Sequence, residues 1–149
     1  LVTASDNTGP MPFDETVTSI TRVSTTATVT HTAHGLISGY KVQIKGANEQ
    51  EYNGVYVISN VSANAYDYTV SGAPASPATG TIKATGVVID GTTDGSGIIS
   101  DTRTHASDQP ITGRVRKATG GTLYKTGVIS GTISSTTGFS TTVAMVPDQ

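Results

Sequence analysis

Two histidines separated by two residues, His31 and His34 in the sequence HTAH, are the first side chains that could do chemistry. Imidazole is a common metal ligand and proton carrier near neutral pH. In an extended strand, residues i and i+3 point to opposite faces, so we expect that the two rings do not easily share a metal. The sequence therefore favours a structural role for both histidines.

Carboxylates gather in the second half of the chain, around the sequence DGTTDGSG. Asp90 and Asp94 lie in this stretch and Asp101 follows it, but it lacks the alternating oxygen ligands and the closing Glu of a calcium loop. Asp-Gly and Ser-Gly are turn-forming pairs, so we interpret it as a turn cluster. His105 lies near Asp101 and Asp108 in sequence, and there we expect local hydrogen bonding instead of catalysis.

The sequence contains no motif typical of a hydrolytic enzyme. Serines are plentiful, yet no GxSxG motif marks a nucleophile, and there is no Cys. Glu49, Glu51 and Asp67 could supply the paired carboxylates of a glycosidase. However, the chain has few aromatic residues on which a bound sugar could stack. We predict that the chain is not an enzyme and needs no cofactor or metal.

Most of the positive charge in the second half comes from Arg103, Arg114, Arg116 and Lys117. Arg114 and Arg116 alternate along one predicted strand and share a face. This face is either simply solvated or forms ion pairs with an acidic partner, for which Arg is well suited. A nucleic-acid partner is not expected, because the net charge is −2 and no large basic surface is indicated.

Composition favours strands over helices. Only 13% of the 149 residues are charged and 35% are hydrophobic, while Thr, Ser and Gly fill the remainder. Thr suits a pleated, half-exposed surface, and Gly supplies turns and bulges. With two Phe, six Tyr and no Trp, we expect small cores built mainly from Val and Ile. The longest apolar run, residues 55–58, is far too short to cross a membrane, and no signal peptide is visible.

Periodicity and turn residues divide the chain into three parts. Residues 1–15 contain two Pro and no periodicity, which predicts an extended arm outside any sheet that could dock Met11 and Phe13 on a neighbouring subunit; a frayed terminus is the alternative. Residues 16–84 and 85–149 predict two small all-β domains. Expected strands lie near 17–23, 26–30, 41–45, 55–58, 66–70 and 82–84, and then near 87–89, 98–99, 110–117, 123–133 and 139–146.

Several short motifs in residues 17–84 occur in a characteristic order. They are TATVT, HGL, KVQIKGA, EYNGVYVIS, YDYTV and a final GTI. In this order they resemble a small β-barrel module of tailed-bacteriophage structural proteins, often labelled by its similarity to the first catalytic-cysteine half-domain of ubiquitin-activating enzymes. The resemblance implies that His34 ends a strand, Gly35 relaxes the backbone and Leu36 plugs the barrel. One departure is Gly39-Tyr40, where the module usually has Gly-Asp.

The second half, with PITGRVRKAT followed by a Tyr-Lys strand and a long final hairpin, resembles the C-terminal part of phage virion proteins and implies a β-sandwich-like fold. From both resemblances we expect a structural virion protein assembled in the host cytoplasm. A capsid decoration (cement) protein on the outer head surface is the favoured class. A tail, neck or fibre component is the alternative. The expected partners are the major capsid protein or another virion protein, together with further copies of the chain, and no membrane.

Overall fold

A computed structural model describes residues 1–102, 106–117 and 124–148, and it confirms the all-β prediction. Apart from one 3-10 turn (η1), every regular element in these ranges is a strand. The elements are β1 (Val2–Ala4), β2 (Glu15–Thr16), β3 (Ser19–Val23), β4 (Thr26–Thr30), β5 (Lys41–Ala47), η1 (Gln50–Tyr52), β6 (Gly54–Val57), β7 (Ala65–Thr69), β8 (Gly80–Ile89), β9 (Gln109–Val115) and β10 (Gly127–Ile133).

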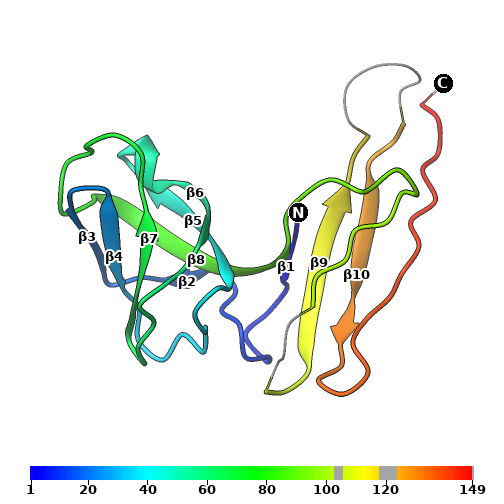
Figure 1. Ribbon diagram of the computed structural model, residues 1–149, viewed down its shortest axis with the longest axis horizontal. Coiled ribbons are helices and arrows are strands. Elements are labelled where there is room, and N and C mark those ends of the chain that lie inside the picture. Colours follow the sequence, from blue (N-terminus) through cyan, green and yellow to red (C-terminus); the bar gives the residue numbers. More distant parts are fainter. Residues whose placement is uncertain (103–105, 118–123, 149) are drawn as a thin grey trace.

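The long strand β8 organises the larger of two antiparallel sheets. That sheet has the order β10-β9-β1-β8-β5-β6, and β2 pairs with β8 as a further strand. One edge of β8 carries β5, whereas the opposite edge carries first β2 and then β1. Figure 1 shows the result: β8 leaves a first lobe, residues 15–84, and runs toward a second lobe made of β1, β9, β10 and the segment 139–148.

The smaller sheet, β3-β4-β7, completes the first lobe. An isolated bridge between Ser59 and Asp67 joins the end of β6 to β7. On the other side, the Val17 N–H donates to the Ile82 carbonyl and the Ala78 N–H donates to the Ile20 carbonyl. These contacts connect the two sheets along both of their edges and enclose the main core between them.

Val and Ile supply more than half of the buried hydrophobic residues, as expected, and tyrosines supply the largest side chains of the core. Tyr52, Tyr66 and Tyr68 are the largest fully buried side chains of the described residues. The Tyr52 hydroxyl donates to the Ala75 carbonyl at 2.9 Å, and the Tyr68 hydroxyl donates to the Tyr52 carbonyl at 3.2 Å. Their polar ends are therefore satisfied, which permits burial of large rings.

The prediction that residues 1–15 form an arm outside any sheet is wrong for Val2–Ala4. These residues are β1, which pairs with β8 on one side and β9 on the other. Val2 and Ala4 are buried, and both partner strands supply backbone hydrogen bonds that three isolated residues could not provide. Further along, the Gly86 N–H donates to the Pro12 carbonyl at 2.7 Å. The segment is thus built into the chain's own fold.

The second lobe buries little. Among the described residues from 90 onward, only Gln109 and Ile111 are buried. The expected last strand near 139–146 is not regular, since only Tyr124–Pro147 forms an isolated bridge there. Side chains of the segment 139–148 nevertheless lie over glycines of β10. A Cβ added at Gly127 would meet Val143, and one added at Gly131 would meet Phe139. Because glycine has no side chain, Gly127 and Gly131 leave space for segment 139–148.

The predicted division between residues 84 and 85 falls inside β8, which continues through it without interruption. Residues 85–89 pair with β1 and β5, so the large sheet extends across this position. The division into separate domains remains a prediction.

A pair of glycine substitutions tests how closely the N-terminal segment packs. Gly35 and Gly39 both have positive φ, but an added Cβ at Gly35 would lie 2.2 Å from the Pro10 carbonyl oxygen, whereas nothing lies within 4 Å at Gly39. Gly39→Ala should cost about 1–2 kcal/mol from backbone strain alone. Gly35→Ala should cost about 1–3 kcal/mol more, because Pro10 must move. Urea unfolding measures both values, and equal losses would contradict this packing.

Candidate functional site

A cluster of titratable side chains lies where β4 ends. It contains Glu15, His31, His34 and Tyr66, and we call it the histidine cluster. The strand β4 ends at Thr30, and Ala33 adopts a left-handed conformation with φ of 53°. This reversal brings the two imidazole rings to 5.5 Å between centroids. The expectation that they point to opposite faces is wrong, because the chain between them is not extended.

Hydrogen bonds define the proton positions at His31. Its Nε2 lies 3.0 Å from Glu15 Oε2, and its Nδ1 lies 3.4 Å from the Tyr66 hydroxyl. A carboxylate can only accept, so Nε2 carries a proton, and in the neutral ring Nδ1 accepts from Tyr66. Burial, followed by the Glu15 charge, raises the pKa of Tyr66, which keeps its hydroxyl a donor. His31 thus links β2, β4 and β7.

His34 is held in the neutral state. Its Nδ1 accepts the Leu36 N–H at 3.0 Å, and its Nε2 is buried without a hydrogen-bond partner within bonding distance. Burial lowers the pKa of His34, and the neighbouring His31 lowers it further. The backbone carbonyls of Ser62 and Ala65 and the Glu15 carboxylate oppose this shift without reversing it. The expectation that His34 ends a strand is wrong, because β4 ends at Thr30 and a turn at residues 32–33 precedes His34. The chain does turn at this corner as expected, since Gly35 has φ of 65° and Leu36 is buried.

A partly open cavity of about 130 Å³ lies between this corner and the N-terminal segment. Its lining comes from the two sides of that contact: Asn7, Gly9, Pro10, Met11, Pro12, Glu15, Ala33 and His34. Within the described residues, no group of three or more His, Cys, Asp or Glu side chains is placed to hold a metal ion. The geometry supports a structural role, in which the cluster holds residues 9–15 against the end of β4.

Met11, predicted as a docking side chain, contributes to the chain's own core. It is 1% exposed, and its side chain occupies the space next to Gly86, where an added Cβ would meet it at 2.6 Å. Its N–H donates to Gln109 Oε1 at 2.8 Å, and Gln109 itself is fully buried at the start of β9. The sequence carried no signal for Gln109, which ties the N-terminal segment to the second lobe. Phe13 is partly buried against the same core.

The other predicted partner residues remain at the surface. Arg114 and Arg116 are exposed, the first inside β9 and the second just beyond it. Residues 109–147 include four cations and no carboxylate; the cations are Arg114, Arg116, Lys117 and Lys125. This part of the second lobe is consequently basic, although the whole chain is weakly acidic.

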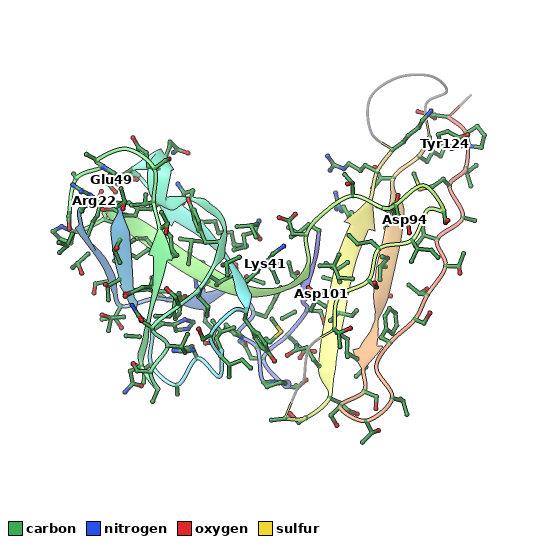
Figure 2. The ribbon with its side chains drawn as sticks, viewed as in Figure 1. Arg22, Lys41, Glu49, Asp94, Asp101 and Tyr124 are labelled. Carbon is green, nitrogen blue, oxygen red and sulfur yellow. The ribbon has the colours of Figure 1, made fainter. Side chains whose placement is uncertain are left out.

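The predicted carboxylates mostly bind nearby backbone or hydroxyl groups. Asp94 accepts the N–H groups of Ser96 and Ile98, which confirms its turn role, and Figure 2 shows it in the second lobe, away from Glu49 in the first. Asp108 and Glu49 likewise accept from the backbone, at Ser135 and Thr79. Thr28 and Asn60 donate to Asp67. His105 and Arg103 lie outside the described residues.

In comparisons with known proteins, no family model, no curated protein and no solved structure matches this chain. Among the described residues, none of the elements is a helix with the length and apolar character needed to cross a membrane.

Replacement of Met11 separates a core role from a purely docking role. Met11→Ala should destabilise the isolated chain by about 2–5 kcal/mol, because a buried side chain is removed next to a glycine that cannot fill the space. Phe13→Ala, at a partly buried position, is the matched control and should cost less. Denaturant unfolding checks both, and an unchanged midpoint for Met11→Ala would show that residue 11 does not belong to the core.

Acidification should destabilise the fold through His34. Its pKa in the folded chain is lowered, whereas an unfolded histidine titrates near about 6.5. The unfolded chain therefore binds more protons below about pH 6.5, so the stability is complete above that pH and decreases as the pH falls toward the lowered value. Urea unfolding at a series of pH values measures this, with His34→Gln as the control that should reduce the pH dependence. An NMR titration placing the His34 pKa at or above the unfolded value would refute it.

Proposed function

We propose that this chain is a structural subunit of a tailed-bacteriophage particle, most specifically a decoration protein that binds the outer surface of the head. The proposal assigns it no catalytic activity and no cofactor. Its partners are the major capsid protein or another virion protein, and further copies of itself. It places the protein in the virion after assembly in the host cytoplasm. The finer fold interpretation, a small β-barrel followed by a sandwich-like domain, belongs to the same proposal.

The observation that carries the proposal is that residues of the EYNG and HGL motifs form the core and the turns of the first lobe. In EYNG, Tyr52 is fully buried, and the Asn53 amide accepts the Ala47 N–H and donates to the Ala47 carbonyl. In HGL, Gly35 turns the chain and Leu36 enters the core. These are residues that the resemblance to the phage module rests on, and each fixes a connection between strands. Their structural use supports a likeness of fold, and the connections between the two sheets support the barrel interpretation.

The second lobe supplies features suited to a subunit contact. One face of β10 is open, since Val128 is 67% exposed and Ser130 and Thr132 are exposed too. Arg114 lies opposite Val128 in the register of β9 and β10. An apolar and hydroxyl-bearing face beside exposed arginines can pair with an acidic protein surface, where Arg forms bidentate bonds to carboxylates. We therefore assign the head contact to this lobe.

Electron micrographs of particles assembled without this protein test the proposal. A decoration protein predicts loss of surface density from the head or lower capsid stability, with intact tails. Loss of tail, neck or fibre parts would instead support the alternative class. Unaltered particles, together with absence of the protein from purified virions, would overturn both.

Charge reversal on the second lobe tests the assigned contact. The double variant Arg114→Glu and Arg116→Glu should fold normally, because both side chains are exposed, but should bind undecorated heads at least about tenfold more weakly. Glu51→Lys, an exposed charge reversal in the first lobe, is the control and should bind like the original protein. Quantitative sedimentation with purified heads measures occupancy. If the double variant occupies the heads as fully as the original protein, Arg114 and Arg116 do not contribute to the head contact.

A further inference from the structure

We propose that the gap between β8 and β9 is an interaction site between copies of this chain, in which residues 1–5 of one copy replace β1 of another. The partner is a second copy that exchanges its N-terminal strand. This inference goes beyond the virion proposal and does not depend on it, since the exchange can be observed with purified protein in solution.

The site is defined by backbone pairing on both sides of β1. Thr3 is opposite Val87 of β8 and Thr112 of β9. The Ser5 N–H donates to the Pro110 carbonyl at 3.0 Å, and the Arg114 N–H donates to the Leu1 carbonyl at 3.1 Å. No direct pairing of β8 with β9 occurs in the sheet order, so β1 is the strand that joins them. An empty gap would leave two strand edges without partners.

Side chains make the gap specific for this segment. Val2 is 5% exposed and Ala4 is fully buried. Opposite Val2 stands Gly113, where an added Cβ would lie 2.7 Å from the Leu1 carbonyl oxygen and 2.8 Å from the Val2 Cα. The absence of a side chain at Gly113 thus creates the space that the first two residues fill. A second copy carries the same residues and fits without any new contact.

The residues that follow β1 are suited to act as a hinge. Asn7 and Thr8 are exposed. Asp6 accepts from the Thr8 N–H and hydroxyl, so these bonds stay within the moving segment, whereas the Asn7 side chain accepts from the Phe13 N–H and marks where the hinge meets the anchored part. From Met11 onward the segment is anchored in the core. Strand β1 can therefore leave its own gap while the first lobe keeps its contacts.

Exchange between two copies restores every bond that residues 1–5 make to β8 and β9. Both gaps are filled in the exchanged pair, so the difference in free energy consists mainly of the association entropy and the hinge conformation. Such exchange is a low-cost route to dimers. High local concentration, as in any array of copies, shifts the equilibrium toward the exchanged form.

A disulfide introduced across β1 and β9 reports the exchange directly. Leu1 and Arg114 form a hydrogen-bonded pair, so the alternation of antiparallel strands makes Ala4 and Ile111 a non-hydrogen-bonded pair, whose side chains lie closest. The chain has no cysteine of its own. The double variant Ala4→Cys and Ile111→Cys is refolded at increasing protein concentration and then oxidised. We expect a covalent dimer whose share rises at least severalfold with concentration.

Single-cysteine variants control for random cross-linking and should stay monomeric on non-reducing gels wherever the double variant dimerises. A double variant that forms only the intramolecular disulfide at every concentration would overturn the inference.

Two complementary variants give an independent measurement that does not rely on cysteines. Gly113→Val blocks the gap but keeps the strand, and a chain lacking residues 1–5 keeps the gap but has no strand. Mixed, they should form a one-to-one complex by light scattering, while each alone stays monomeric. Adding Val2→Asp to the donor should abolish the complex. If the deleted chain keeps a folded first lobe by NMR yet binds neither this donor nor a synthetic peptide of residues 1–7, strand exchange is ruled out.

Discussion

The pairing of β1 between β8 and β9 is the constraint on which the arrangement of this molecule depends. Strand β8 is shared by both lobes, and near its end it pairs with β5 on one edge and with β1 on the other (Figure 1). The second lobe contributes few buried side chains of its own. Its position relative to the first lobe therefore relies on β1, on the Gln109 contact with Met11, and on Ile111, Ile129 and Ile133, which belong to or pack against the main core.

A continuous set of contacts connects this pairing to the histidine cluster. His34 holds the Leu36 N–H, Gly35 lies against Pro10, and Met11 beside it reaches Gln109 at the start of β9. Each step is close packing or a hydrogen bond, so the N-terminal segment connects the corner to the start of β9. His31 holds separate segments together through Glu15 and Tyr66, whereas the His34 bond to the Leu36 N–H is local and fixes the corner itself.

Sequence patterns predicted the first-lobe strands in which apolar and polar residues alternate. They missed elements that form only through pairing with strands far away in the sequence. The strands of the first lobe follow Thr, Val and Tyr alternation, and the HGL corner follows from its resemblance. Val2–Ala4 is too short to show periodicity and becomes a strand only because two edges flank it. The approach of His31 and His34 depends on one left-handed residue, Ala33, which alternation cannot reveal. Alternation in 139–146 predicted a strand that the structure does not contain, although Val143 packs next to Gly127 of β10.

Amide hydrogen exchange of the intact chain tests most directly whether the N-terminal segment joins the lobes. The informative groups are the N–H groups of Ser5, Gly86 and Arg114, which donate to Pro110, Pro12 and Leu1. If the segment is part of the sheet, all three exchange far more slowly than exposed loop amides, and removal of residues 1–5 releases the Arg114 amide, whose acceptor is Leu1, while Gly86 stays bonded to Pro12. Exchange of these three amides at unprotected rates in the intact chain would contradict the account, because residues 1–5 would then lie outside the fold.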